Sequence, residues 1–192
     1  YSNNCKSQTP DSIKFLYQLE YKNELHKDIR KFEQKCIKYN DSIYWIDCLA
    51  SYFSPDSCYH HEPFKITKEE GGIYMSYGES DSIISLLRFP LNTYDTIGIT
   101  YNERDVVIFD GAKYITFLGI EELNILGQKR KCFLFKMSYK KNFATGIIKI
   151  LYLDTELLVP MMITSEKIND KNEIDNRFYY NLMIIGITKL GG

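Results

Sequence analysis

The sequence predicts a mainly β fold with one helix, arranged as a curved antiparallel meander sheet or half-barrel. The 192 residues include 16 Tyr and 11 Phe but a single Trp, and Tyr and Phe favour half-buried, pleated surfaces. Turn-forming residues recur roughly every 8 to 14 residues, which is typical of antiparallel meanders. Apolar residues make up 44% of the chain, which is enough for an ordinary globular core.

The first predicted strand covers residues 13–21, where Phe15, Tyr17 and Leu19 alternate with polar residues. The segment from Asn23 to Lys38 is the one helical candidate, because Asn23 can cap a helix and the apolar residues after it share one helix face. These apolar residues are Leu25, Ile29, Phe32 and Cys36. A pair of polar strands is the alternative for this segment.

The other apolar segments predict strands separated by turns rich in Gly, Pro, Asn, Asp and Ser. They cover residues 42–53, 64–67, 73–77, 83–89, 96–101, 106–109, 114–126, 131–139, 147–153, 157–167 and 178–188. Pro160 within the tenth of these indicates an edge strand or a bulge. Several later strands are apolar on both faces, so the second face must line a cavity, pack in a sandwich or meet another subunit.

We expect residues 1–11 to form a flexible N-terminal lead and residues 12–192 to form a single β-rich domain, because no linker, repeat or low-complexity tract divides the chain. The chain begins with Tyr1 rather than methionine, so we expect its natural start to have been removed. The longest apolar stretches are far shorter than the ~20 residues of a membrane-spanning helix, so no transmembrane span is expected.

The charge balance argues against a nucleic-acid partner. The chain has 24 basic and 25 acidic side chains and a net charge of −1, whereas nucleic-acid-binding domains usually carry a basic patch. The basic clusters at 129–131 and 140–141 lie where strand ends are expected, and there they protect sheet edges and favour solubility.

The sequence predicts no enzyme, no metal site and no cofactor. It has three His, no G-x-S-x-G motif and no phosphate-binding loop. The densest group of potential metal ligands is Cys58, His60 and His61, but adjacent His side chains in an extended segment point in opposite directions. A polar surface loop is the expected role for this group.

The five cysteines form no C-x-x-C pair. Cys5 precedes a polar tether, which is where a bacterial lipoprotein carries its acylated cysteine, although Ser2 to Asn4 depart from the usual signal; the alternative is a free thiol in a flexible terminus. If the protein is exported, at least one disulfide is expected among the other four. The alternative is that these four, Cys36, Cys48, Cys58 and Cys132, are reduced core residues.

The second half resembles a known family. Arg88-Phe89-Pro90-Leu91 precedes Tyr94-Asp95-Thr96-Ile97, and the segments 120–123 with Gly127, 131–135, 151–154 and 158–161 follow in order. This succession, over about residues 85–165, is similar to the lipoprotein-carrier-like (LolA/LolB-like) half-barrels of the Gram-negative envelope. No catalytic residue transfers, because the family has none.

The resemblance implies a non-enzymatic exported protein, periplasmic or anchored to the outer membrane, that binds an apolar ligand such as a lipid in the concave face of its sheet. The expected lining is Tyr114, Phe117, Phe133, Phe135, Ile148, Tyr152, Met161 and Met162. For each of these, plain core packing is the alternative. The alternative function is a structural or assembly subunit of the envelope that binds a protein partner.

Overall fold

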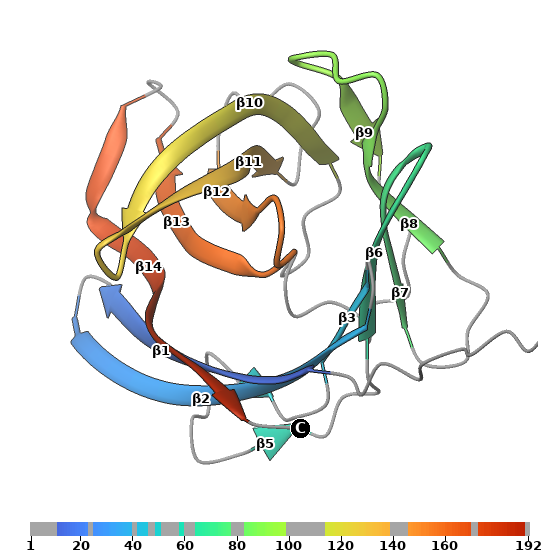
Figure 1. Cartoon of the computed structure of the whole chain (residues 1–192). Coiled ribbons are helices and arrows are strands. Elements are labelled where there is room, and N and C mark those ends of the chain that lie inside the picture. The colour runs from blue at the N-terminus through green and yellow to red at the C-terminus, as the bar shows by residue number, and fades with distance from the viewer. Residues whose placement is uncertain are drawn as a thin grey trace, which may run out of the picture.

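The computed structural model describes residues 11–22, 25–39, 42–45, 49–50, 58–59, 64–77, 83–98, 114–138, 146–169 and 173–190. Within these ranges the chain forms β-strands and no helix. Twelve of the strands build one antiparallel sheet that curls into a nearly closed barrel (Figure 1). The predicted curved, mainly β architecture is therefore confirmed.

The strands alternate in direction, and each strand of the large sheet pairs with its neighbours in antiparallel register. Their bounds are β1 Asp11–Lys22, β2 Lys27–Tyr39, β3 Ser42–Trp45, β4 Leu49–Ala50, β5 Cys58–Tyr59, β6 Phe64–Glu69, β7 Gly72–Tyr77, β8 Ile83–Arg88, β9 Thr96–Gly98, β10 Tyr114–Ile125, β11 Gln128–Ser138, β12 Gly146–Asp154, β13 Pro160–Ile168 and β14 Ile174–Leu190. Strands β4 and β5 form a separate two-stranded ribbon.

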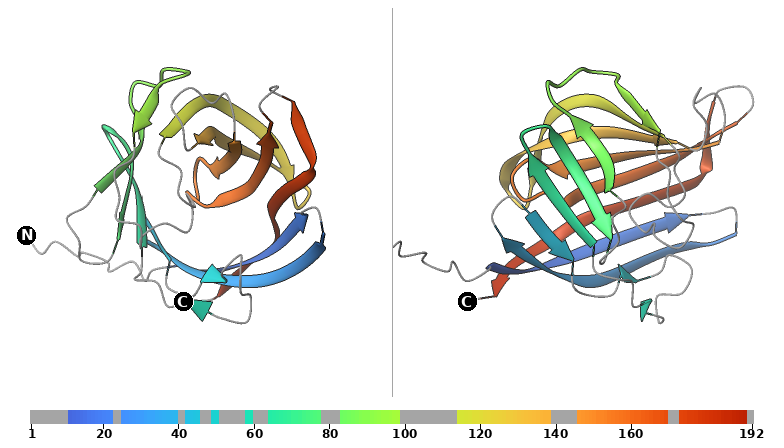
Figure 2. Two further views of the ribbon diagram at one scale, coloured as in Figure 1. Left: turned by 180° about the vertical axis from the view of Figure 1, so that it is seen from behind. Right: turned by 90° about the vertical axis from the view of Figure 1, so that its right-hand side faces the viewer.

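The strand order shows how the barrel closes. It runs β8-β7-β6-β3-β2-β1-β14-β13-β12-β11-β10-β9, so two meanders meet where the first strand pairs with the last. Strands β10 to β14, β1 and β2 lie side by side as one curved wall (Figure 2). The two ends of the sheet are β8 and β9, which are consecutive in the chain but are not paired with each other. The seam of the barrel therefore lies between β8 and β9.

The helix predicted at Asn23–Lys38 is wrong, because β2 occupies most of this segment. Strand β2 pairs with β1 along its whole length, from Asp11 opposite Lys38 to Lys22 opposite Lys27. Gln34 and Cys36 are buried while residues 33 and 35 are exposed, which is the two-residue alternation of a strand. Pairing with β1 outweighs the weak helical spacing, as tertiary context commonly does.

The other predicted strands are present with shifted ends. Within the predicted segment 42–53 the described residues form β3 and β4, and the expected strand at 106–109 lies outside the described residues. Pro160 begins β13, at a register shift opposite Leu153, so the predicted bulge is confirmed.

The interior of the barrel is mainly apolar, because most of the alternate residues that point inward are apolar, although polar side chains such as Gln34, Lys149 and Ser165 are also buried. The inward-facing core includes Ile13, Phe15, Tyr17, Ile43, Ile66, Ile73, Met75, Ile115, Phe135, Met137, Leu151, Leu153, Met161 and Ile163, each 2% exposed or less. Tyr17 donates a hydrogen bond from its buried hydroxyl to the Pro160 carbonyl at 3.0 Å. This bond satisfies the one polar atom of a side chain that is otherwise enclosed by apolar groups.

The turn between β12 and β13 closes one end of the barrel. Leu158 and Val159 are 3% and 0% exposed, so the turn folds inward over the core. The Asp154 carboxylate holds this turn, because its Oδ1 accepts hydrogen bonds from the backbone N–H groups of Glu156 at 2.8 Å and Leu157 at 2.7 Å. Lys38 donates from β2 to the Glu156 carbonyl at 3.0 Å, which ties the turn to β2.

Candidate functional site

Among the described residues, the wall of the barrel is interrupted at the seam between β8 and β9, where the two ends of the sheet are not paired. A connection over residues 89–95 joins the two strands and contains a cis peptide bond before Pro90. Phe89 donates its N–H to the Gly71 carbonyl at 3.1 Å, which fastens the start of the connection to the β7 side. Tyr94 donates to the Phe117 carbonyl at 2.7 Å, which fastens its end to β10. The two sides of the seam are thus held by different parts of the sheet.

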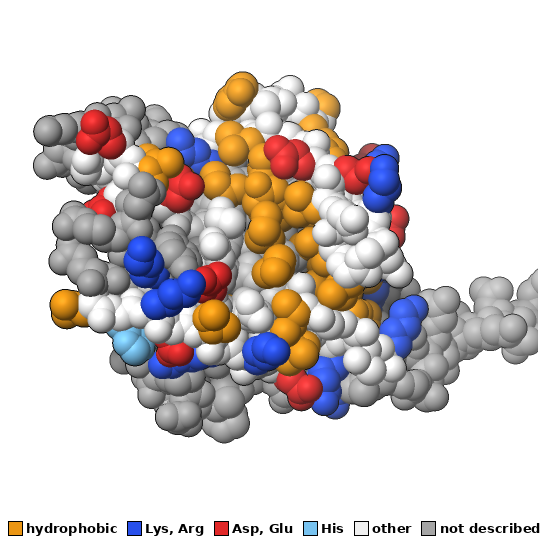
Figure 3. All heavy atoms as spheres, turned by 90° about the vertical axis from the view of Figure 1, so that its left-hand side faces the viewer, with side chains coloured by type: hydrophobic (Ala, Val, Ile, Leu, Met, Phe, Trp, Pro, Cys, Tyr) orange, Lys and Arg blue, Asp and Glu red, His pale blue; other side chains and the backbone are white. Residues whose placement is uncertain are grey.

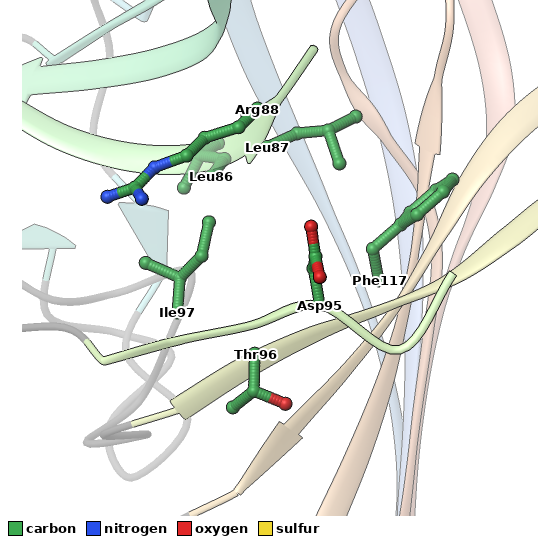
Figure 4. Close-up of a pocket in the computed structure, with 7 residues that line it drawn as sticks. All are labelled: Leu86, Leu87, Arg88, Asp95, Thr96, Ile97 and Phe117. Atoms are coloured by element: carbon green, nitrogen blue, oxygen red, sulfur yellow. The ribbon is translucent and has the colours of Figure 1, made fainter. Parts of the chain in front are cut away.

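A pocket of about 200 Å³ lies at this seam (Figure 4). Its lining comes from three strands and the connection before β9, and consists of Leu86, Leu87, Arg88, Asp95, Thr96, Ile97 and Phe117. Leu87 and Phe117 belong to the core, at 2% and 4% exposed. The pocket therefore extends from the surface to the apolar interior.

Both charged and apolar groups line this pocket. In Figure 4 the Asp95 carboxylate points into the space between Leu87 and Phe117, whereas the Arg88 guanidinium points outward. Leu86, Leu87, Ile97 and Phe117 can contact an apolar group, whereas the Asp95 carboxylate inside the pocket and Arg88 at its mouth can contact polar groups. The volume of the pocket is below the ~300 Å³ of a typical ligand pocket, so it fits part of a ligand.

Four of the eight predicted lining residues lie on the inner face. Phe117, Phe133, Phe135 and Met161 belong to the core, and the three phenylalanine rings contact one another with centroids 5.9 to 6.4 Å apart. A side chain that lines a cavity keeps part of its solvent-accessible surface. Phe135 and Met161 are only 1% and 0% exposed, so the interior around them is close-packed.

The other four predicted residues lie on the outer face. Tyr114, Ile148, Tyr152 and Met162 alternate along their strands with the inward-facing Ile115, Lys149, Leu151 and Ile163, and they are half-buried. The structure thus does not bring the eight residues together around one space. Of the eight, Phe117 also lines the seam pocket, and a ligand role for the others stays a prediction.

An apolar row crosses the outer face of the wall. Leu134, Tyr152, Met162 and Met183 stand opposite one another in register on β11 to β14, and Met183 is 41% exposed. Figure 3 shows hydrophobic side chains as a band across this side of the molecule. Burial raises the pKa of Tyr152 above its usual value, with smaller contributions from the nearby charges of Glu121 and Cys132.

Sequence reasoning missed the seam pocket as a site. Arg88, Asp95 and Ile97 were noticed only as parts of the family resemblance, and Leu87 only as part of a strand. The missing information was the pairing order, because the pocket exists only where β8 and β9 remain unpaired. No local pattern in the sequence specifies that these two consecutive strands do not form a hairpin.

Neither Cys36 nor Cys132 forms a disulfide, and both side chains are fully buried. The disulfide predicted for an exported protein therefore does not involve them, and the side chains of Cys48 and Cys58 lie outside the described residues. Burial and, to a smaller extent, the Asp154 carboxylate raise the pKa of Cys132 to about 12.

We expect Cys36 and Cys132 to resist alkylation in the folded protein at pH 8, because both thiols are buried and the raised pKa of Cys132 makes its reactive thiolate scarce. Both should react once urea unfolds the chain. Iodoacetamide labelling followed by peptide mass spectrometry measures this, and rapid labelling of either residue in the native state would contradict the packing described here.

Within the described residues, no helix is long and apolar enough to cross a membrane, and no three His, Cys, Asp or Glu side chains are placed to hold a metal ion. The cluster of Cys58, His60 and His61 is not covered by this statement, because its side chains lie outside those residues.

No protein-family model matches the chain, and no curated protein sequence matches it. Solved structures do match over most of its length. One is described as an outer membrane lipoprotein-sorting protein domain from Vibrio parahaemolyticus, with 12% identity, a TM-score of 0.29, and coverage of 94% of this chain and 86% of that one. Another is a LolA superfamily protein from Nitrosomonas europaea, with 10% identity, a TM-score of 0.28, and coverage of 95% and 87%.

A third match is the MucA/MucB complex from Pseudomonas aeruginosa, with 11% identity and a TM-score of 0.36. It covers 93% of this chain but 52% of the matched chain, so the present chain spans about half of that protein. Two of these matches have descriptions that name the lipoprotein-carrier group that the sequence resembles, at low identity. Superpositions this loose say nothing about the ligand or role of the chain.

Proposed function

We propose that the chain is a non-enzymatic, exported protein of the bacterial envelope that binds the apolar part of a small ligand, such as an acyl chain, in the seam pocket. The observation that carries this proposal is the pocket itself, which opens at the surface and has Leu87, Ile97 and Phe117 as apolar walls. Location in the envelope is supported by the sequence resemblance over residues 85–165.

This proposal places the ligand at the seam instead of deep in the concave face. The inner side chains around Phe135 are close-packed, so a ligand there would have to displace them. At the seam, a chain end can enter without such a displacement, while its polar head stays near Arg88 at the surface. The residues provide contact and orientation and no reactive group.

We expect saturated fatty acids to bind with an affinity that rises with chain length and then levels off. Each methylene buried contributes ~0.8 kcal/mol, or about a fourfold change in Kd. Because the pocket holds only about 200 Å³, the gain should stop when it is full. Isothermal titration of a homologous series measures this, and affinities that do not change with chain length would contradict the proposal.

Ile97→Asp tests the location, because it places a carboxylate in the apolar wall of the pocket at a half-buried position. We expect it to reduce binding at least about tenfold while the protein stays folded, since burying an unpaired charge is strongly unfavourable. Met183→Asp on the outer face is the matched control and should bind normally. Equal binding by wild type and Ile97→Asp would place the ligand elsewhere.

A protein partner is the second candidate, and the apolar outer row favours it. Leu134, Tyr152, Met162 and Met183 stand in register on the convex face, where Leu134 is buried, Tyr152 and Met162 are half-buried and Met183 is exposed, and exposed apolar patches are common at protein interfaces. In this case the chain is an assembly subunit, the Met183→Asp variant loses its partner, and no fatty acid binds at the seam.

A further inference from the structure

The connection between β8 and β9 contains a strained residue beside the seam pocket. Tyr94 has a φ of 71°, a left-handed conformation that is unfavourable for a bulky side chain. The residue is 74% exposed, so packing against the rest of the chain does little to offset this strain. Strained residues that the surrounding structure holds in place are concentrated at binding and active sites.

Hydrogen bonds hold Tyr94 against the wall of the pocket. Its N–H donates to the carbonyl of Phe117 at 2.7 Å, and the Phe117 N–H donates to the carbonyl of Asp95 at 3.1 Å. Phe117 and Asp95 both line the pocket. The backbone of Tyr94 is therefore next to two lining residues, and a side chain of this length can reach the pocket mouth.

The walls of the pocket do not enclose a whole acyl chain. The pocket opens at the surface and holds only about 200 Å³, so the methylenes next to the polar head of a bound chain remain at the mouth. Methylenes that stay in water add no hydrophobic stabilisation. An exposed aromatic ring beside the mouth can cover them.

We propose that Tyr94 is a ligand-contacting residue of the seam pocket, whose ring packs over the methylenes at the mouth when an acyl chain is bound. This inference rests on the acyl-chain function proposed above and names the residue that covers the exposed part of the ligand. Tyr suits this place because its ring covers apolar surface while its hydroxyl stays in water. A turn alone would need no ring, since Gly or Asn adopts a positive φ with less strain.

Tyr94→Asn tests the contact, because Asn lacks the ring but tolerates the left-handed conformation. We expect it to weaken the binding of dodecanoate about fivefold, as for the loss of one aromatic ring over an alkyl chain, and not to lower the melting temperature. Tyr94→Phe keeps the ring and should bind as the wild type does. Isothermal titration and thermal melts of the intact chain measure these effects. An equal loss in the Asn and Phe variants would assign the effect to the hydroxyl and contradict the inference.

Leu126→Asn is the matched control for backbone strain. Leu126 has a φ of 54° and is 49% exposed, and it lies in the turn after β10, whereas β9 pairs with the start of that strand. Asn before Gly127 suits a two-residue hairpin turn, so this variant should melt at the same or a higher temperature and bind dodecanoate normally. Weaker binding by this variant would show that binding responds to strain anywhere in the sheet, which also contradicts the inference.

Nuclear Overhauser contacts between the Tyr94 ring and bound dodecanoate provide a readout that a purely structural role would not give. The ring should contact the methylenes nearest the carboxylate and not the terminal methyl group, because the chain end lies inside the pocket. Without any such contact, or with equal binding by the wild type and Tyr94→Asn, the inference fails and the acyl-chain function stands. If the wild type binds no dodecanoate, the acyl-chain function fails and this inference fails with it.

Discussion

Phe135→Asp is expected to abolish the cooperative thermal unfolding of the protein, whereas Tyr152→Asp leaves it intact. Phe135 is 1% exposed and contacts the rings of Phe117 and Phe133 at centroid distances of 5.9 and 6.4 Å. The substitution removes these contacts and buries a carboxylate without a partner. Removal of a buried phenylalanine alone costs about 3 to 5 kcal/mol, which is comparable to the whole stability of many domains.

Tyr152 is the matched control, because it lies on the neighbouring strand in the outer row and is only half-buried. A carboxylate there can reach water, so we expect a loss of about 1 kcal/mol. Circular dichroism melts of the two variants and the wild type measure the difference. A folded Phe135→Asp variant with a normal melt would mean that Phe135 borders an open cavity, which would restore the concave-face ligand site.

Asp154→Ala is expected to destabilise the protein by about 3 kcal/mol, mainly by releasing the β12–β13 turn. The carboxylate is 2% exposed, accepts two backbone N–H bonds, and has the Arg130 guanidinium 3.6 Å away. Removing it leaves buried donors and a partly buried cation without their partner, and such losses are larger than the net value of the bonds. For a chain of this size, the melting temperature should fall by roughly 6 to 12 °C.

Asp154→Asn tests which part of the interaction matters. It keeps an acceptor oxygen for the turn but loses the charge beside Arg130, so the loss should be about 1 kcal/mol. Glu156→Ala alters an exposed side chain in the same turn and should change stability by less than about 0.5 kcal/mol. Urea unfolding at pH 7 measures all three variants. Equal effects of the Ala and Asn variants would indicate that the hydrogen bonds to the turn contribute little.

The sequence predicted most strands of the barrel because their signals are local. In 13–21 the alternation of apolar and polar residues, and in 131–139 an apolar run rich in Phe, identify a strand together with flanking turn residues and without reference to neighbouring strands. The helix at 23–38 failed because its apolar residues fit helical spacing while its burial is decided by pairing with β1. In a short, highly charged segment, the few apolar residues do not distinguish helical spacing from strand alternation. Pairing with a neighbouring strand then decides which structure forms.

The candidate site was harder to predict because it depends on distant pairing. β1 pairs with β14, although about 160 residues separate them in the chain, and this pairing leaves the seam at β8 and β9. Whether Tyr152 or Leu151 points inward depends on the register of the strand, because a shift of one residue moves every side chain to the opposite face. The second-half strands are apolar on both faces, so the sequence could not distinguish the core from the outer row.

The most direct test of the seam as the binding site is to map the chemical shifts of the protein while a medium-chain fatty acid is titrated in. Backbone and methyl signals report each residue separately, so the result does not depend on the stability of any variant. The account predicts that the shifts concentrate at Leu86, Leu87, Ile97 and Phe117, which line the pocket. Shifts confined to Leu134, Tyr152, Met162 and Met183 on the outer face, or the absence of any saturable shift, would contradict it.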